Sequence, residues 1–286
     1  MHLGQTGAVP LSSSATAPAT QLLRAVPVAA GSGLRALLSG PPQPVTVAGI
    51  GRGAAHLRTG DGRVVTVMTA DAPRLPCAVV TGNRAPLDLP WTVGQSGTAG
   101  AGRLLVGDLT LPVRRWWSAR PVLEPPAPGR LAAAGALLRR LPDDAAEVPQ
   151  DVIDGLAHAV AGQDPIRAAV RALAGLGPGL TPAGDDVLVG LLSALVCLRH
   201  PQADRYAEEV LAGAAGRTTD LSTTLLRHAA AGECLAAVAG LLQAVCRTGD
   251  PSGARRALAA VGHSSGPALC LGVRLGVQAT AGEIGG

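Results

Sequence analysis

The chain contains no phenylalanine and no lysine, and its aromatic residues other than histidine are one tyrosine and three tryptophans. All of its basic residues are therefore arginines. These arginines are scattered, and Trp91, Trp116, Trp117 and Tyr206 do not alternate with them as a stacking platform for nucleic acid requires. We therefore expect no nucleic acid partner. The net charge of +4 stays compatible with a small anionic metabolite.

Long apolar runs are also missing. The longest apolar helical run, Val187 to Leu198, has twelve residues, whereas a membrane-spanning helix needs about 20. The start of the chain is rich in Ala, Ser, Thr and Pro, and it lacks the basic segment and continuous apolar stretch of a secretory signal. We therefore expect no membrane partner and a cytoplasmic location.

The cysteines do not follow a metal-binding or disulfide pattern. There are five of them at wide spacings, and neither a CxxC nor an HExxH sequence occurs. An odd number of widely spaced cysteines, three of them in apolar helical patterns, is typical of free thiols in a reducing compartment. The missing motifs argue against a structural zinc site.

Short runs rich in β-branched residues occupy the first half of the chain, and turn residues separate them. The runs are Val45–Ala48, Arg63–Met68, Cys77–Thr81, Arg103–Val106 and Leu109–Leu111. Gly60-Asp61-Gly62 and Gly107-Asp108 each lie between two such runs and are hairpin signals. The pattern favours an antiparallel meander or small barrel over a parallel sheet.

A proline-rich stretch, Arg120–Gly129, separates this region from an Ala- and Leu-rich remainder with helical spacing. Gly and Pro divide that remainder into about seven helices. We predict an α+β fold in which a β-rich antiparallel N-terminal domain precedes a larger all-helical C-terminal domain. The predicted boundaries are a flexible lead-in over 1–43, the β-rich domain over 44–119, a linker over 120–129 and the helical domain over 130–286.

The segment Gly175–Asp186, GLGPGLTPAGDD, combines a glycine-rich turn with the start of an apolar helix. Thr181 is predicted to be the N-cap and Pro182 the first helical residue. Asp185 shares the inward face of that helix with the leucines that follow, and Asp186 points about a quarter turn away. A carboxylate that faces an apolar layer needs a partner, which makes Asp185 informative.

The functional interpretation of this segment is an anion site with two catalytic carboxylates, Asp185 and Asp186. Glycines permit backbone amides to converge on an anion at the positive end of a helix. The predicted anion- or substrate-binding residues here are Gly177, Gly179, Leu180, Thr181 and Gly184. The alternative is a tight interhelical turn whose aspartates complement the helix dipole. No cofactor is required by the motif, although Asp185 and Asp186 could bind Mg²⁺.

A second segment, Gly262–Gly266, has the sequence GHSSG and formally matches the nucleophile elbow of serine hydrolases at Ser264. An elbow needs a preceding strand, whereas the residues before Gly262 have helical spacing, so we do not expect a hydrolase. We predict instead a turn in which Ser264 or Ser265 caps the last helix and presents hydroxyl groups to a pocket, with His263 as a catalytic candidate. Capping alone is the alternative.

A third segment, Arg217–Thr224, is a polar cluster in a helical region. Its Arg217, Thr218 and Ser222 are candidates for contacts with an anionic substrate. The alternative is that its hydroxyls cap a helix.

These three segments, GLGPGLTPAGDD, TTDLSTTLLRHAAAGE and GHSSGPALCLG, resemble in the same order a bacterial family described as a domain of unknown function. That family is typified by one subunit of the oxamate carbamoyltransferase of allantoin breakdown, and the resemblance covers residues 130–280. It implies a part in carbamoyl transfer between carbamoyl phosphate and oxamate, in a complex with other carbamoyltransferase subunits. The chain departs from the family at Ala183, where Ser is common, which removes one possible hydroxyl contact with an anion.

The resulting hypothesis is an oxamate carbamoyltransferase subunit-like protein that takes a small anionic substrate. The alternative is a non-catalytic module that binds a small anion or a nucleotide and regulates or scaffolds its partners.

Overall fold

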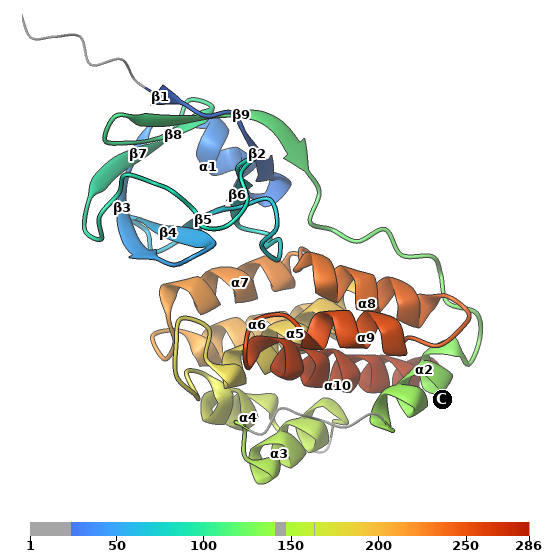
Figure 1. Cartoon of the computed structure of the whole chain (residues 1–286). Helices are drawn as coiled ribbons and strands as arrows, with labels where there is room; N and C mark the ends of the chain where they lie inside the picture. Colours follow the sequence, from blue (N-terminus) through green and yellow to red (C-terminus); the bar gives the residue numbers. More distant parts are fainter. Residues whose placement is uncertain (1–23, 141–146, 163, 286) are drawn as a thin grey trace, which may run out of the picture.

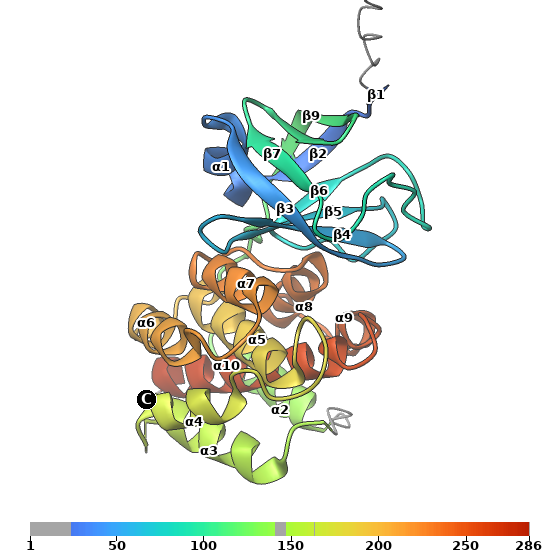
Figure 2. The same cartoon turned by 90° about the vertical axis from the view of Figure 1, so that its left-hand side faces the viewer.

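We describe a computed structural model of the chain, over residues 24–140, 147–162 and 164–285. A β-barrel formed by residues 24–117 lies above a helical region, and an extended segment that runs down one side joins the two (Figure 1). Turned by 90°, the structure shows the barrel resting on one face of the helical region, with α7 and α8 nearest to it (Figure 2).

The barrel is a closed sheet. Its strands lie in the order β1-β9-β2-β6-β5-β4-β3-β7-β8, and a further pairing of β8 with β9 closes a ring of eight strands, with β1 as an addition beside β9. The strands are β1 (Arg24–Ala25), β2 (Val28–Gly31), β3 (Gln43–Ile50), β4 (Ala54–Thr59), β5 (Val64–Met68), β6 (Ala78–Val80), β7 (Ser96–Gly100), β8 (Arg103–Val106) and β9 (Leu109–Trp117). The short helix α1 (Arg35–Ser39) follows β2. Closure pairs both edges, so the ring itself leaves no open edge.

The predicted fold class, with an antiparallel β-rich domain, is wrong, because the barrel is mixed. β2 and β1 both pair with β9 in parallel, and β5 pairs with β6 in parallel. The two hairpin signals do form turns between antiparallel neighbours, β4–β5 and β8–β9. Hairpins reveal only strands that are adjacent in sequence, whereas the parallel pairs join segments whose contact leaves no local turn signal.

The barrel begins earlier than the sequence analysis placed the β-rich domain. Strands β1 and β2 and helix α1 occupy part of residues 24–43, which the sequence analysis assigned to the lead-in. The remainder of that predicted lead-in, residues 1–23, lies outside the described residues. The chain leaves the barrel after Trp117 and has no regular secondary structure until α2 begins at Arg130, so the proline-rich stretch connects the two parts.

Nine helices follow within the described residues, compared with the seven or so that the punctuation predicts. They are α2 (Arg130–Arg139), α3 (Gln150–Val160), α4 (Ile166–Leu173), α5 (Ala183–Cys197), α6 (Ala203–Ala214), α7 (Asp220–Ala230), α8 (Ala236–Cys246), α9 (Ser252–Ala259) and α10 (Ser265–Gly285). The central pair is α5 and α10. A Cβ atom at Gly272 of α10 would lie 2.0 Å from the carbonyl oxygen of Val187, so only glycine permits this approach of the two backbones.

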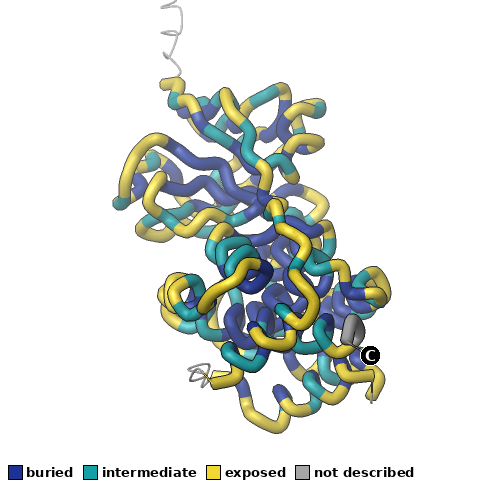
Figure 3. The backbone as a smooth tube through the Cα atoms, turned by 90° about the vertical axis from the view of Figure 1, so that its right-hand side faces the viewer, coloured by how far each residue is buried: buried dark blue, intermediate teal, exposed yellow. Residues whose placement is uncertain are grey.

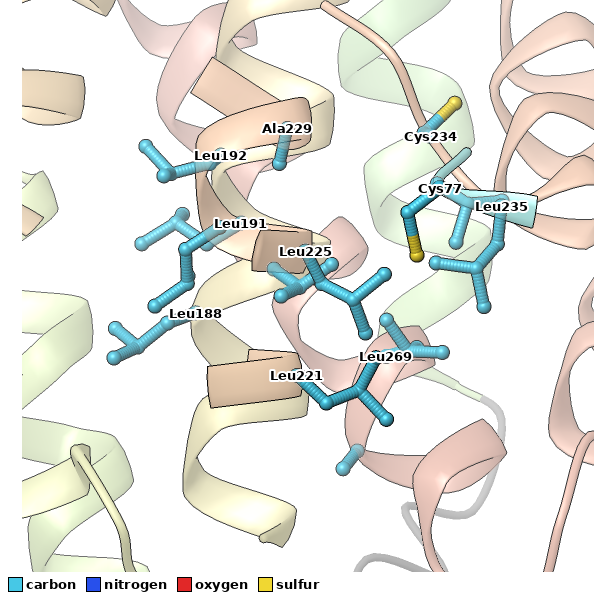
Figure 4. Close-up of a cluster of buried hydrophobic side chains, with 14 of the residues drawn as sticks. Cys77, Leu188, Leu191, Leu192, Leu221, Leu225, Ala229, Cys234, Leu235 and Leu269 are labelled. Carbon is cyan, nitrogen blue, oxygen red and sulfur yellow. The ribbon is translucent and has the colours of Figure 1, made fainter. Parts of the chain in front are cut away.

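Helix α5 is buried on every side. All residues from Ala183 to Leu195 are buried, including two aspartates. Helices α7 and α10 contribute leucines to the same layer, including Leu221, Leu225 and Leu269 (Figure 4). The backbone coloured by burial shows buried segments inside both the barrel and the helical region, with exposed loops around them (Figure 3).

The barrel and the helical region share one core. A single cluster of buried residues includes barrel side chains and helical ones, and Cys77 of the barrel lies beside Leu235 in Figure 4. Direct hydrogen bonds also cross the boundary. The Val64 amide donates to Thr224 Oγ1 at 3.0 Å, and the Ala236 amide donates to the carbonyl oxygen of Arg74 at 3.2 Å. The barrel is therefore packed directly on the helical region.

Candidate functional site

Three loop segments far apart in sequence meet where α5 begins. The glycine turn before α5 contacts the loop before α7 through Thr219, whose hydroxyl donates to the carbonyl oxygen of Leu180 at 2.6 Å. The same turn contacts the start of α10, because Thr181 Oγ1 and Ser265 Oγ lie 3.0 Å apart. The three segments that the sequence analysis singled out thus form one site.

Asp185 holds two loops of this site together through hydrogen bonds. Its side chain is fully buried, and its Oδ1 accepts a hydrogen bond from the Gly175 amide at 2.9 Å. Its Oδ2 accepts a hydrogen bond from the Thr218 hydroxyl. Both oxygens are thus satisfied by protein donors, one from each neighbouring loop. The partner that a buried carboxylate requires is therefore supplied by the protein itself.

Gly175 permits this arrangement. It has a φ of +78°, and a Cβ atom at this position would lie 2.3 Å from the carbonyl oxygen of Arg217. Only glycine combines this conformation with so close a backbone neighbour. The turn is thereby pressed against the loop before α7, and this contact aligns the Gly175 amide with Asp185.

Asp186 differs sharply from its neighbour. Its residue is 3% exposed, and its Oδ2 has no hydrogen-bond partner among the described residues. The pKa of this carboxyl is raised to about 7, mainly by burial and in part by the adjacent Asp185 charge, while hydrogen bonds from the Ser265 and Thr181 hydroxyls act in the opposite direction. The site therefore holds one carboxyl that exchanges its proton near neutral pH.

The predicted capping role of Thr181 is wrong. Helix α5 begins at Ala183, the N-cap is Pro182, and no side chain caps the helix. The Thr181 hydroxyl lies instead beside Ser265 Oγ and helps to surround Asp186. Because the Asp185 and Asp186 amides already donate to the Pro182 carbonyl oxygen, the start of the helix does not need a hydroxyl cap.

The tip of the glycine turn faces solvent. Gly177, Gly179 and Leu180 are exposed, and Leu180 is 55% exposed despite its apolar side chain. The amides of Gly177 and Gly179 donate to no other residue in the part of the chain that is described. Gly184, another predicted anion contact, is buried, and a Cβ atom there would lie 2.1 Å from the carbonyl oxygen of Leu173. It permits close packing of α5 on the end of α4.

The loop before α7 contains both capping and free polar groups. Thr219 is the N-cap of α7 and accepts a hydrogen bond from the Ser222 amide at 3.0 Å. The Ser222 hydroxyl is buried and has no partner among the described residues. The Arg217 side chain is exposed at the edge of this loop and forms no ion pair with another described residue.

The turn before α10 places its polar residues unequally. Ser265 contacts Thr181, whereas the Ser264 carbonyl oxygen accepts a hydrogen bond from the Ala268 amide at 3.2 Å. His263 is exposed and has no hydrogen bond or ion pair with another described residue. The segment that precedes the turn is helix α9, so the strand required by a nucleophile elbow is absent at this position.

No cluster of three or more His, Cys, Asp or Glu side chains suited to a metal ion occurs within residues 24–140, 147–162 and 164–285. Asp185 uses both oxygens to accept hydrogen bonds. Binding of Mg²⁺ at Asp185 and Asp186 stays a prediction.

Residues 173–277 match the family described as oxamate carbamoyltransferase subunit AllH. This match confirms the resemblance that the three motifs indicate. It covers the whole site, from the glycine turn through the loop before α7 to the start of α10, and it leaves the barrel outside. No curated protein and no solved structure matches the chain. Among the described residues, no helix is both long and apolar enough to cross a membrane.

A cavity beside the AllH-matched segment involves barrel residues that the sequence analysis did not single out. It has a volume of about 310 Å³ and lies between the barrel and the loop before α7. Its polar lining includes His56 and Arg58 from β4 and Asp220 from α7, and Arg58 forms an ion pair with Asp220. Burial lowers the pKa of His56. The alternation of side chains along a strand predicts that His56 and Arg58 share one face of β4, but no local sequence signal indicates that α7 lies opposite them.

Proposed function

We propose that this chain is a subunit of an oxamate carbamoyltransferase, and that its substrate site is centred on Asp186, Thr181 and Ser265. The observation that carries the proposal is the unpartnered oxygen of the buried Asp186 carboxyl, beside the Thr181 hydroxyl of the same segment and the Ser265 hydroxyl from the start of α10. A buried charge without a partner costs several kcal/mol, and such a cost is typical of functional sites. The AllH match supports the class of reaction.

The chemistry of carbamoyl transfer needs a group of this kind. The amide nitrogen of oxamate attacks the carbonyl carbon of carbamoyl phosphate, a new C–N bond forms, the C–O bond to phosphate breaks, and phosphate leaves. The nitrogen must lose a proton during attack. A carboxyl with a pKa of about 7 accepts that proton at neutral pH and returns it when the reaction runs in reverse.

The exposed turn supplies the second requirement, which is recognition of anions. Gly177 and Gly179 present free amides near the positive end of α5, and Arg217 presents an exposed guanidinium on the adjacent loop. Backbone amides at a helix start and an arginine are both suited to phosphate and carboxylate groups. In this proposal they hold the phosphate of one substrate or the carboxylate of the other, while Asp186 handles the proton.

The test is an assay of the chain in complex with the proteins that co-purify with it. Phosphate release from carbamoyl phosphate is measured with and without oxamate, for the wild type, Asp186→Asn and a control variant, Asp204→Asn, whose aspartate is exposed on α6. We expect oxamate-dependent release in the wild type and the control, and a loss of at least ~100-fold in kcat for Asp186→Asn.

Two outcomes would contradict the proposal in different ways. Full activity of Asp186→Asn would remove this carboxyl from the mechanism while leaving the family assignment intact. A wild-type complex that binds oxamate or phosphate in calorimetry but transfers no carbamoyl group would favour the non-catalytic anion-binding module.

A further inference from the structure

A second group of reactive side chains lies at the far end of α5. Asp186 and Cys197 are eleven residues apart on this helix, which corresponds to roughly 16 Å. Cys197 lines a cavity of about 400 Å³ that is also lined by Arg120, Arg199 and Cys246. This cavity is separate from the site of the proposed function.

The Cys197 thiol has a second thiol as its neighbour. The Cys197 thiol lies against the segment that carries Cys234, and each sulfur lies near a backbone carbonyl oxygen. The Cys197 thiol donates to Gly232 at 3.6 Å, and the Cys234 thiol donates to Ala119 at 3.9 Å. Gly232 precedes Cys234 by only two residues, so this contact holds the two cysteines in neighbouring positions, as a disulfide requires.

The two thiols differ in access and in charge environment. Cys234 is buried, whereas Cys197 is half-buried and faces the cavity. The interaction with the Cys234 side chain lowers the pKa of Cys197, burial acts in the opposite direction, and the positive charge of Arg120 lowers the pKa further. Arg120 lines the same cavity as Cys197, and its guanidinium lies 3.7 Å from where a Cβ atom would be at Gly232, the residue that Cys197 contacts. An accessible thiol stabilised as thiolate is the form that oxidants attack.

We propose that Cys197 and Cys234 are the site of a reversible, peroxide-driven disulfide, with Cys197 as the thiol attacked first and Cys234 as the resolving thiol. The Cys197 thiolate attacks one oxygen of hydrogen peroxide, the O–O bond breaks, and hydroxide leaves to give a sulfenic acid. The Cys234 sulfur then displaces the hydroxyl group from Cys197 and loses its own proton. In total, two thiols and one peroxide give one disulfide and two water molecules, and a dithiol reductant reverses the change.

Cys246 provides a matched control because it lines the same cavity. Unlike Cys197, it is buried at 6% exposure, and burial raises its pKa. Cys77 is fully buried in the shared core, where burial raises its pKa to about 11. Neither residue has the combination of access and thiol neighbour that Cys197 has.

The disulfide would connect two neighbouring segments of the helical region covalently. It would join the last residue of α5 to the segment between α7 and α8, and enclose α6 and α7 in one loop. The carbonyl oxygen of Ala119 also accepts from the Cys234 amide, so the connection reaches the chain where it leaves the barrel.

The test uses the full chain, purified under reducing conditions, exchanged into buffer without reductant and treated with hydrogen peroxide. Non-reducing peptide mapping by mass spectrometry should recover a Cys197–Cys234 linked peptide that dithiothreitol abolishes. Cys197→Ser should prevent the link, and Cys246→Ser should leave it unchanged. Cys234→Ser should trap the sulfenic acid, so that dimedone labels Cys197 in a folded protein.

The proposal is overturned if the wild type forms a Cys197–Cys246 link instead, or if Cys197 becomes irreversibly oxidised without any disulfide. It is also overturned if dimedone fails to label Cys197 in the Cys234→Ser variant while that variant retains the circular dichroism spectrum of the wild type.

Discussion

Replacing Asp186 by asparagine should make the protein more resistant to unfolding as the pH rises, even though the same change removes the proposed catalytic carboxyl. The carboxyl is 3% exposed, and burial raises its pKa from 3.8 to about 7. Below pH 3.8 the group is protonated in both the folded and unfolded chains. Between pH 3.8 and about 7 only the unfolded chain ionises it, so the free energy of unfolding falls as the pH rises. Above pH 7 the loss is complete and constant.

The size of the effect follows from this shift. One pKa unit corresponds to about 1.4 kcal/mol, so the full loss is about 4 kcal/mol, of which about 2 kcal/mol is already present at pH 5. Asparagine does not ionise, and the cost of burying its own amide does not depend on pH. The stability of Asp186→Asn relative to the wild type should therefore be about 2–3 kcal/mol more favourable at pH 8 than at pH 5.

The assay is urea denaturation followed by circular dichroism at pH 5, 6, 7 and 8, for the wild type, Asp186→Asn and the exposed control Asp204→Asn. The quantity to compare is the difference in free energy of unfolding between each variant and the wild type. We expect this difference to change with pH for Asp186→Asn and to stay constant for the control. A constant difference for both variants would refute the reasoning, because it would mean that the folded chain does not hold the Asp186 carboxyl in a protonated form near neutral pH.

Three further predictions test other parts of the structure. Asp185→Ala removes both oxygens that accept hydrogen bonds from the neighbouring loops, and should lower the free energy of unfolding by about 2–4 kcal/mol in urea denaturation. A loss below about 0.5 kcal/mol would contradict the role of Asp185 in holding these loops. Gly184→Ala places a methyl group against the Leu173 carbonyl oxygen and should lower the free energy of unfolding by several kcal/mol. Gly155→Ala, in an open position of α3, should raise it by about 0.5–1 kcal/mol. Equal effects of the two substitutions in thermal melts would contradict the packing role of Gly184. His56→Gln should reduce the loss of stability below pH 6.5, because burial lowers the pKa of His56 in the folded chain and the unfolded chain therefore binds a proton more readily. The same fall in melting temperature below pH 6.5 for the variant and the wild type would contradict this.

The barrel shows which parts of a fold can be predicted from the sequence. The hairpins at Gly60–Gly62 and Gly107–Asp108 rest on local turn chemistry, and both form. The parallel pairing of β2 with β9 depends on residues at opposite ends of the barrel segment, and short β runs do not indicate which distant run lies beside them. The antiparallel prediction is wrong because local signals report only antiparallel neighbours.

The site shows the same division between local and non-local information. The glycine turn, its position before an apolar helix and the polarity of the two loops near it follow from spacing and composition. The separate roles of Asp185 and Asp186 do not. Periodicity assigns one inward face to α5, but this helix is buried all round, so both aspartates are enclosed and their partners decide the difference. Those partners, Thr218 and Ser265, come from segments that the sequence cannot place beside α5.

The parallel pairing of the first strands with β9 also has a consequence for the order in which the protein folds. Gly31 pairs with Trp117, so β2 has no partner on that side until the last barrel strand has been synthesised. During synthesis the incomplete sheet exposes unpaired strand edges at both β2 and β8, and pairings between distant segments form slowly. Closure of the ring is thus a late event. A chain that ends before Leu109 keeps both of these edges unpaired, whereas a chain that includes β9 has the strand that closes the ring.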